Sequence, residues 1–257
     1  MNDNSRTEVR TRQFCWIVLP AYNEELSLPS LLDRIAVAME EAGYPYRVVV
    51  VDDGSGDSTA SIAEKYAQRI PLLLERHPAN MGLGATIRDG MLRAITDSNP
   101  SDIIITMDAD NSHNPELIPR MGRLIREGND VVIASRYQHG STIRGVSLLR
   151  RVLSYGAGML FRMVFPIPGV RDYTCGYRAY RASALKQAVR HYKQEMFNQA
   201  GFQCMVDILL KMRLLDFIFT EVPMILRYDM KEGASKMKVA RTIKNTLFLM
   251  VRRRIGA

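Results

Sequence analysis

Residues 102–110 read DIIITMDAD, and this stretch decides the expected fold. Its first five residues form a short, β-branched, apolar run, which is typical of a buried strand. Asp108 and Asp110 follow two residues apart, at the end of the strand where an α/β sheet binds its ligands. Mg²⁺ and Mn²⁺ favour carboxylate oxygens and often bridge them to a substrate diphosphate. The stretch therefore predicts a buried strand that ends in a candidate metal site.

Strand and helix signals alternate on both sides of this stretch. Apolar runs predict strands at 14–19, 47–51, 70–75, 102–106 and 130–134, and helical spacing predicts helices at 28–42, 57–68, 82–95 and 115–127. Ser27 is the expected N-cap of the first helix. The regular β–α order predicts an α/β fold with a mostly parallel sheet and helices on both faces.

The pattern changes after Arg136. Helices are expected at 146–165, 182–191, 201–215 and 237–255, and a strand at 217–222. The last helix is amphipathic and basic. We expect three regions: a disordered N-terminal tail at 1–13, one domain at 14–236 and a basic amphipathic C-terminal helix at 237–257.

The net charge of +8 is concentrated at one end of the chain. Residues 231–257 hold eight Lys and Arg residues and one acid, Glu232, and so carry +7, which leaves +1 for residues 1–230. A nearly neutral body argues against a nucleic-acid-binding protein, which needs a basic face. A localised basic end favours contact with an anionic surface or with phosphate groups.

Cysteine usage and the lack of export signals indicate a cytosolic protein. Cys15, Cys175 and Cys204 are odd in number and widely spaced, so we expect three free thiols. The N-terminal tail lacks the apolar centre of a signal peptide. The most apolar long segment, 152–170, is broken by Arg162 and two prolines, so no membrane-spanning helix is expected.

Four polar groups are expected to meet at one edge of the sheet, because parallel strands end there together. The four groups are 20–25 (PAYNEE), 52–55 (DDGS), 108–110 (DAD) and 135–137 (SRY). Each group comes just after a predicted strand. A single such loop is commonly only a turn, but four with carboxylates and an arginine predict a binding site. No dinucleotide fingerprint or P-loop is present. Tyr22 can instead stack on a base, and Asp53 can accept hydrogen bonds from base or ribose.

Seven motifs occur along the chain in a specific order: VLPAYNEE, VVDDGSGDST, NMGLGATIRDGM, MDADNSHNPE, ASRY, DYTCGYRAYR and RYDMKEGASKM. In this order they resemble the family 2 glycosyltransferases, which have the GT-A (Rossmann-like) fold. Within that family they are most similar to the dolichol-phosphate mannose synthase branch of the polyprenyl-phosphate sugar transferases. The resemblance covers residues 14–236, most of the chain.

The resemblance implies roles for the matched positions. The donor site would comprise Pro20, Tyr22, Glu24, Val51, Asp53, Asp108, Ala109, Asp110 and Lys236. Mg²⁺ or Mn²⁺ would be held by Asp108, Asp110 and Ser112. Arg136 would meet the sugar phosphate or acceptor phosphate, and Arg150 and Ser154 match a pattern that binds the lipid phosphate. Asp110, Arg136 and Lys236 would thus be the catalytic residues.

One segment departs from the family pattern. Residues 223–236 are about one residue longer than the corresponding segment of the mannose synthases. The late arginine of the family therefore corresponds to Arg227 or is replaced by Lys231, and both are donor-site candidates. This leaves the donor sugar open.

The expected mechanism needs no general base. The Gln-x-x-Arg-Trp motif of relatives that use an aspartate base is absent, and Trp16, the only tryptophan, is expected in the core. A phosphate monoester has a second pKa of about 6, so it can attack the anomeric carbon unaided. We expect one inverting displacement, in which the metal and Lys236 stabilise the nucleoside diphosphate leaving group.

The histidines and Asp172 are the remaining candidates for a catalytic acid or base. The four histidines, which we expect to be surface or loop residues without a catalytic role, are His77, His113, His139 and His191. Asp172 is the reserve candidate for a base, and a structural hydrogen bond is the alternative for it.

The preferred hypothesis is transfer of mannose from GDP-mannose to a polyprenyl or dolichyl phosphate. Glucose from UDP-glucose, or another sugar, is an alternative donor group. A second alternative is a soluble family 2 enzyme that acts on a hydroxyl acceptor. A non-enzymatic nucleotide-sugar-binding subunit is disfavoured, because the motifs at 108–110 and 235–236 are complete.

The expected partners are the nucleotide sugar, the lipid phosphate, and a membrane surface or a membrane partner subunit. Segments 146–165 and 237–255 combine apolar faces with arginines, as interfacial helices do. A solvated basic face is the alternative for the second segment. We expect a cytoplasmic protein that associates peripherally with the cytoplasmic face of a membrane.

Overall fold

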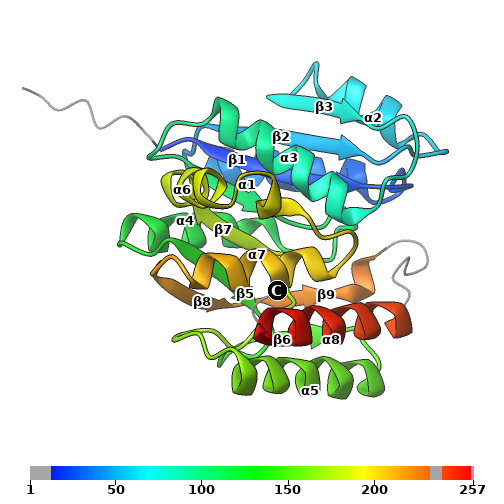
Figure 1. The fold of residues 1–257 in the computed structure, drawn as a ribbon. Coiled ribbons are helices and arrows are strands. Elements are labelled where there is room, and N and C mark those ends of the chain that lie inside the picture. Colours follow the sequence, from blue (N-terminus) through cyan, green and yellow to red (C-terminus); the bar gives the residue numbers. More distant parts are fainter. Residues whose placement is uncertain (1–12, 232–238, 256–257) are drawn as a thin grey trace, which may run out of the picture.

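The computed structural model describes residues 13–231 and 239–255, and its centre is a seven-stranded sheet (Figure 1). The strand order is β3-β2-β1-β4-β7-β5-β8. β7 runs antiparallel to β4 and β5, while the other neighbours pair in parallel, so six strands share one direction. The bounds are β1 (Cys15–Ala21), β2 (Tyr46–Asp52), β3 (Leu72–Arg76), β4 (Ile103–Thr106), β5 (Val131–Ser135), β7 (Arg178–Arg181) and β8 (Phe219–Pro223).

Helices cover both faces of this sheet (Figure 1). One face carries α3 (Leu83–Asp97), α6 (Ala182–Tyr192) and α7 (Gln203–Arg213), and the other carries α1 (Leu28–Glu41), α2 (Thr59–Tyr66) and α4 (Ile118–Arg126). The central strands are apolar throughout because they are buried on both sides. Residues 48–51 and 103–105 are at most 1% exposed. A Cβ on Gly90 would lie 2.5 Å from Val18 Cγ1, so glycine lets α3 approach β1 closely.

Two further helices and a second, small sheet lie toward the β8 end of the main sheet. Figure 1 shows α5 (Leu148–Val164) and α8 (Val239–Ile255) at this end, and α8 packs on α7. β6 (Thr142–Arg144) and β9 (Ile225–Arg227) form a small parallel sheet. Three short 3₁₀ helices complete the fold: η1 (Pro115–Leu117), η2 (Lys193–Phe197) and η3 (Tyr228–Met230). η1 contacts α1 and α4, and η2 contacts α6. Within the described ranges, no helix is long and apolar enough to cross a bilayer.

The predicted α/β class, the mostly parallel sheet and its two helical layers are confirmed. Three short strands, β6, β7 and β9, were not predicted. Ser27 stands at the N-cap position of α1, as expected, but its buried hydroxyl makes no capping hydrogen bond within the described residues. At the start of α2, the Asp57 carboxylate accepts from the N–H of Thr59 (3.0 Å). All three cysteines are buried free thiols, and Trp16 is 4% exposed.

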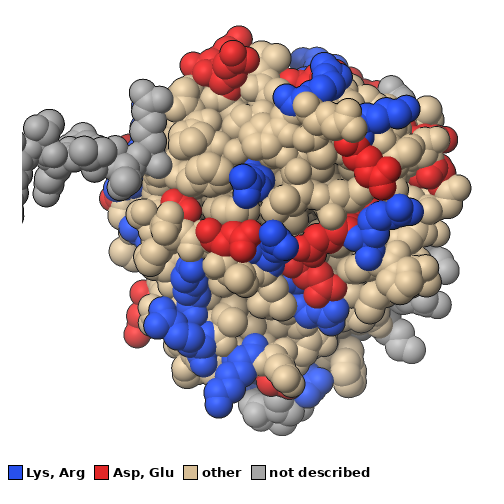
Figure 2. Space-filling model, turned by 90° about the horizontal axis from the view of Figure 1, so that it is seen from above, with Lys and Arg blue, Asp and Glu red and all other residues tan. Residues whose placement is uncertain are grey.

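Surface charge is mixed rather than sorted. Figure 2 shows one face on which Lys and Arg side chains alternate with Asp and Glu side chains. No broad basic surface covers that face, which agrees with the nearly neutral body of the chain. The residues 1–12 of the expected tail, and Lys236, lie outside the described residues.

Candidate active site

A cavity of about 990 Å³ opens at the edge where the six codirectional strands end. Most of the predicted site residues line it: Pro20, Tyr22, Glu24, Asp53, Asp108, Ala109, Asp110, Ser112, Arg136, Ser154 and Lys231. They follow β1, β2, β4 and β5 or come from α5 and the segment after η3. Sequence reasoning therefore identified one spatial cluster from residues up to 211 positions apart.

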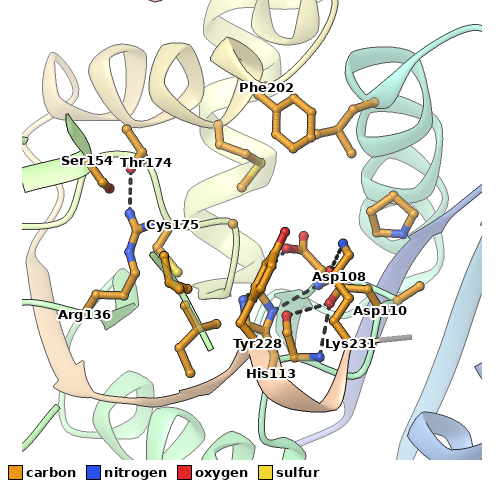
Figure 3. Close-up of a pocket in the computed structure, with 18 of the residues that line it drawn as sticks. Asp108, Asp110, His113, Arg136, Ser154, Thr174, Cys175, Phe202, Tyr228 and Lys231 are labelled. Atoms are coloured by element: carbon orange, nitrogen blue, oxygen red, sulfur yellow. Dashed lines mark hydrogen bonds and ion pairs between the residues drawn. The ribbon is translucent and has the colours of Figure 1, made fainter. Parts of the chain in front are cut away.

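Figure 3 shows two groups of polar side chains across this cavity. Asp108, Asp110, His113 and Lys231 form one group, and Arg136 with Ser154 and Thr174 forms the other. We name these the carboxylate side and the arginine side. Phe202, at the beginning of α7, lies above the carboxylate side in Figure 3.

On the carboxylate side, Asp110 is held by three donors. Its Oδ1 accepts from the backbone N–H (3.1 Å) and the hydroxyl (2.5 Å) of Ser112, and its Oδ2 accepts from Lys231 Nζ (2.5 Å). The loop can turn back on itself because Asn111 adopts a left-handed conformation, with φ of 59°. Asp110 is consequently only 6% exposed and fixed in position.

Arg34 of α1 braces this loop from behind. Its Nη1 donates to Asn111 Oδ1 (2.9 Å) and its Nη2 to Asn114 Oδ1 (2.7 Å). Asn111 directly follows Asp110 in the chain, so the guanidinium supports the backbone that presents the carboxylate. This contact was not predicted, because nothing in the local sequence links residue 34 to residues 111 and 114.

Asp108 is more open, with 46% of its side chain exposed, and it lies beside His113. The backbone N–H of Asp108 donates to His113 Nδ1 (3.1 Å), and the His113 ring stacks on Tyr177 at 5.0 Å. His113 is 4% exposed and lines the cavity. His113 thus lies in a loop, as expected, but it is buried and not at the surface, whereas His139 and His191 are exposed.

The pKa values of the two carboxyl groups shift in opposite directions. Desolvation raises the pKa of Asp108, and the Asp110 carboxylate adds to this effect, against the attraction of His113. Desolvation also acts on Asp110, but the charge and hydrogen bond of Lys231, with the help of His113 and Ser112, outweigh it and lower the pKa. Asp110 is therefore the carboxylate that holds its negative charge more firmly.

The donor set on this side suits a hard divalent cation. Two carboxylates and the Ser112 hydroxyl offer oxygen atoms to the cavity, as Mg²⁺ and Mn²⁺ prefer. Among residues 13–231 and 239–255, no three His, Cys, Asp or Glu side chains group as a complete metal shell. Further ligands would therefore come from a bound diphosphate and water. The ammonium of Lys231 at Asp110 shows that this carboxylate accommodates a positive charge.

On the arginine side, Asp172 binds Arg136 through both ends of its carboxylate. Arg136 Nε donates to Oδ2 (2.8 Å) and Nη2 donates to Oδ1 (2.7 Å), and Nη2 also donates to Thr174 Oγ1 (2.6 Å). Asp172 is fully buried and accepts the N–H of Cys175 as well (3.1 Å). Of the two roles considered for Asp172, the structure shows the structural one.

Ser154 of α5 lies on the same side. Its hydroxyl and that of Tyr137 are 2.7 Å apart, and Tyr137 follows Arg136 in the loop after β5. The Arg136 guanidinium in turn lies 5.4 Å from the centre of the Tyr137 ring. Three hydrogen-bonding side chains are thereby linked on the arginine side.

The wall next to the arginine side is apolar. It is lined by Ile143, Val146, Tyr155, Phe202, Met205, Met224 and Leu226. These residues come from β6, α5, α7, β9 and their flanking loops. The same cavity thus offers charged groups on two sides and a hydrocarbon-like surface on its wall.

Other candidate residues lie away from the cavity or outside the described structure. Val51 is fully buried in the core beneath α3, and Arg227 forms an ion pair with Asp229 (3.0 Å); neither lines the cavity. The backbone of Arg150 lies in α5, but its side chain is not among the described ones, and Lys236 lies in the undescribed 232–238. Their expected roles stay predictions.

Comparisons with known proteins agree with the resemblance read from the motifs. The family model for glycosyl transferase family 2 matches residues 16–188. Dolichol-phosphate mannosyltransferase of Pyrococcus furiosus is 32% identical over 223 residues, which are 86% of this chain and 58% of that protein. Polyprenol monophosphomannose synthase of Mycolicibacterium smegmatis is 31% identical over 231 residues, which are 89% of this chain and 83% of that protein. The chain spans less than two thirds of the first relative.

Solved structures share the fold. Glucosyl-3-phosphoglycerate synthase of Mycobacterium tuberculosis, in complex with Mg²⁺ and UDP, has a TM-score of 0.66 at 20% identity, covering 96% of this chain and 80% of that one. Mannosyl-3-phosphoglycerate synthase of Rubrobacter xylanophilus has a TM-score of 0.59 at 18% identity, and the match covers 95% of this chain and 74% of that one. With the family match, these structures confirm the expected GT-A architecture.

Proposed function

The chain belongs to glycosyl transferase family 2, and from this we propose that it transfers mannose from GDP-mannose to a polyprenyl phosphate, with inversion at the anomeric carbon. The observation that carries the proposal is the division of one cavity into a carboxylate side, an arginine side and an apolar wall. A lipid phosphate has the matching chemistry, because its phosphate needs cations and its chain needs hydrocarbon. The two named relatives act on lipid phosphates according to their names.

The carboxylate side would bind the donor. Tyr22 and Asp53 line the cavity next to the carboxylates, as a nucleoside attached to a diphosphate requires. Asp108, Asp110 and Ser112 would hold Mg²⁺ or Mn²⁺, which when bound would stabilise the charge of the leaving diphosphate. Solved structures of this fold contain Mg²⁺, or Mn²⁺ with UDP-glucose. Lys231 would exchange its contact with Asp110 for one with the diphosphate.

The arginine side would bind the acceptor phosphate. Arg136 uses Nε and Nη2 for Asp172, so its Nη1, which makes no hydrogen bond within the described residues, is left to donate to a phosphate oxygen. The hydroxyls of Tyr137 and Ser154 are bonded to each other, so the pair offers one further O–H donor. Because Asp172 neutralises much of the charge of Arg136, the pair would orient the phosphate more than it attracts it.

The hydrogen bonds of Asp172 and Glu221 also favour a phosphate acceptor. Asp172 is locked by Arg136, and Glu221 is buried and accepts the N–H groups of Arg171 and Asp172 (both 2.6 Å). Neither carboxylate is placed to take a proton from a hydroxyl in the cavity. A phosphate needs no such base, because it is already anionic at neutral pH. This favours a lipid phosphate over the alternative of a hydroxyl acceptor.

Membrane contact would bring the lipid to the site. Tyr155, Met159 and Met163 lie at i, i+4, i+8 spacing on α5 and are all more than half exposed, beside the cavity residue Ser154. On α8, Phe248 and Val251 are exposed beside Arg252 and Arg254. Exposed apolar side chains with arginines are typical of helices that lie in a membrane interface. We propose peripheral association through these two helices.

A transfer assay tests the reaction. Purified protein, metal, and labelled GDP-mannose or UDP-glucose in separate tubes would be incubated with a short polyprenyl phosphate and then extracted with organic solvent. The free polyprenol alcohol is the matched control acceptor. Label should enter the organic phase with the phosphate only and should disappear with EDTA. Transfer to the alcohol at an equal rate would contradict the phosphate acceptor, and label from UDP-glucose alone would replace mannose by glucose.

A further inference from the structure

His77 lies between two carboxylates, and the function outlined so far makes no use of it. It follows β3, and its side chain is only 9% exposed, although a surface or loop position without a role was expected. Its Nδ1 lies 2.7 Å from Asp53 Oδ1, and its Nε2 lies 3.1 Å from Asp89 Oδ2. An ionised carboxylate only accepts, so an N–H at Nδ1 donates to Asp53 and an N–H at Nε2 donates to Asp89.

Asp53 is the carboxylate of this pair that reaches the cavity. Its Oδ1 accepts from His77 and from the N–H of Met81 (2.8 Å), and its Oδ2 accepts from the N–H of Gly82 (2.8 Å). A carboxylate offers about four acceptor positions, so about one stays available on Oδ2. The three protein donors therefore fix the carboxylate in one orientation, and about one acceptor position of this cavity-lining group stays free for a ligand.

The far side of His77 is itself anchored. Asp89 of α3 forms two hydrogen bonds with Arg88, from Nε (2.7 Å) and Nη2 (2.8 Å). The pKa of Asp89 is lowered, because Arg88 and His77 together outweigh its desolvation. The chain Asp53–His77–Asp89 thus connects the cavity to the helix that packs on β1 and β2.

We propose that His77 is a positioning residue for the nucleobase: it holds Asp53 so that the free acceptor position of this carboxylate meets an N–H donor of the base. The inference rests on the proposed nucleotide-sugar donor. In this proposal the Asp53–His77 network recognises the nucleoside. The groups around Asp110 would bind the diphosphate, and His77 does not contact them. Loss of His77 should therefore weaken recognition of the nucleoside and leave diphosphate binding intact.

Two substitutions of His77 distinguish the contact made by Nδ1 from the contact made by Nε2. The amide nitrogen of His77→Asn falls near the position of Nδ1 and can still donate to Asp53, whereas that of His77→Gln falls near Nε2 and reaches Asp89 instead. His77→Leu removes both contacts. The three variants form a matched set at one position, and the first is the expected rescue of the third.

Isothermal titration calorimetry with Mn²⁺ present would measure binding of GDP, UDP and inorganic diphosphate. For the nucleoside diphosphate that the unsubstituted protein binds, His77→Leu and His77→Gln should lower the affinity about tenfold, the effect of about one lost hydrogen bond. His77→Asn should stay within about threefold of the unsubstituted protein. Inorganic diphosphate should bind all four proteins equally.

Unchanged GDP and UDP affinity in His77→Leu, or an equal loss for inorganic diphosphate, would overturn the positioning role. Equal affinities of the Asn and Gln variants would do the same, and this comparison holds even where His77→Leu fails to fold. Absence of nucleoside diphosphate binding by the unsubstituted protein would instead overturn the proposed donor, and the inference with it. The two failures are thus distinguishable in one experiment.

Discussion

Arg136 and Asp172 are joined by two parallel hydrogen bonds of 2.8 and 2.7 Å, in a pair whose carboxylate is fully buried. The two residues are 36 positions apart and meet because β7 runs antiparallel between β4 and β5. The amino end of β7 therefore lies at the edge where the other strands end, and the loop before it carries Asp172 to Arg136. This pairing removes Asp172 from consideration as a general base and makes it the residue that orients the arginine.

Asp172→Asn should destabilise the protein and flatten the acid limb of its pH–stability profile. Burial alone would raise the pKa of Asp172, but the charge and hydrogen bonds of Arg136 outweigh it, and the pKa is lowered. Its contribution is present above the unfolded pKa of about 3.9 and is lost as the pH falls through the lower, folded value. We expect a loss of about 3 kcal/mol at pH 7, which shrinks below about pH 4.

Urea unfolding at pH values from 3 to 7 measures this difference. Asp33→Asn is the control, since its carboxylate is 56% exposed and pairs only loosely with Arg69 (3.8 Å). A constant difference between Asp172→Asn and the unsubstituted protein across this range would contradict the role of the buried pair.

Asp110→Asn should abolish most of the transfer. The substitution removes the charge that would hold the metal and keeps the shape of the side chain, so we expect turnover to fall about 100-fold or more at saturating metal. The assay with labelled donor and polyprenyl phosphate measures it, again with Asp33→Asn as control. Near-full turnover of the variant would show that Asp110 is not a metal ligand.

Arg34→Met should weaken metal binding without touching any proposed ligand. Arg34 supports Asn111 and Asn114 in the loop after Asp110, and loss of such outer contacts typically costs about 10- to 100-fold in metal affinity. Mn²⁺ binding followed by electron paramagnetic resonance measures the effect directly. Arg69→Met, which alters an exposed arginine of the same chain, should bind Mn²⁺ as the unsubstituted protein does. Equal affinities of the two variants would refute the bracing role of Arg34.

Arg253→Leu should loosen α8 without unfolding the domain. Arg253 donates to Asp207 Oδ1 of α7 from Nε (2.8 Å) and lies 2.7 Å from it through Nη2. Lys211 keeps Asp207 paired in the variant, because its Nζ lies 2.5 Å from Oδ2. Hydrogen exchange should therefore accelerate in residues 239–255 and stay unchanged in 203–213. The control is Arg252→Leu, an exposed neighbour, and equal exchange in both variants would argue against this anchor.

Much of the fold and a large part of the site were predictable from local patterns. The apolar runs of β1, β2 and β4 and the spacing of α1 and α3 are local signals, and the rule that parallel strands end together predicted the cluster around Asp108 and Asp110. The short strand β7 was missed, since its four residues, RAYR, carry no alternation and include two arginines. Arg178, its first residue, is nevertheless fully buried and donates to the carbonyls of Met205 and Tyr173.

By itself, the sequence determined the class of the fold, the family and the edge of the sheet at which the site forms, because period, strand ends and motif order are properties of neighbouring residues. Only the tertiary structure decided which charged groups meet. Asp172 pairs with Arg136, His77 with Asp53 and Lys231 with Asp110 across 36, 24 and 121 positions. Such contacts depend on strand order, helix placement and loop path together, and no local pattern encodes them. The roles of acid, cation and orienting residue therefore follow from the packing of the chain.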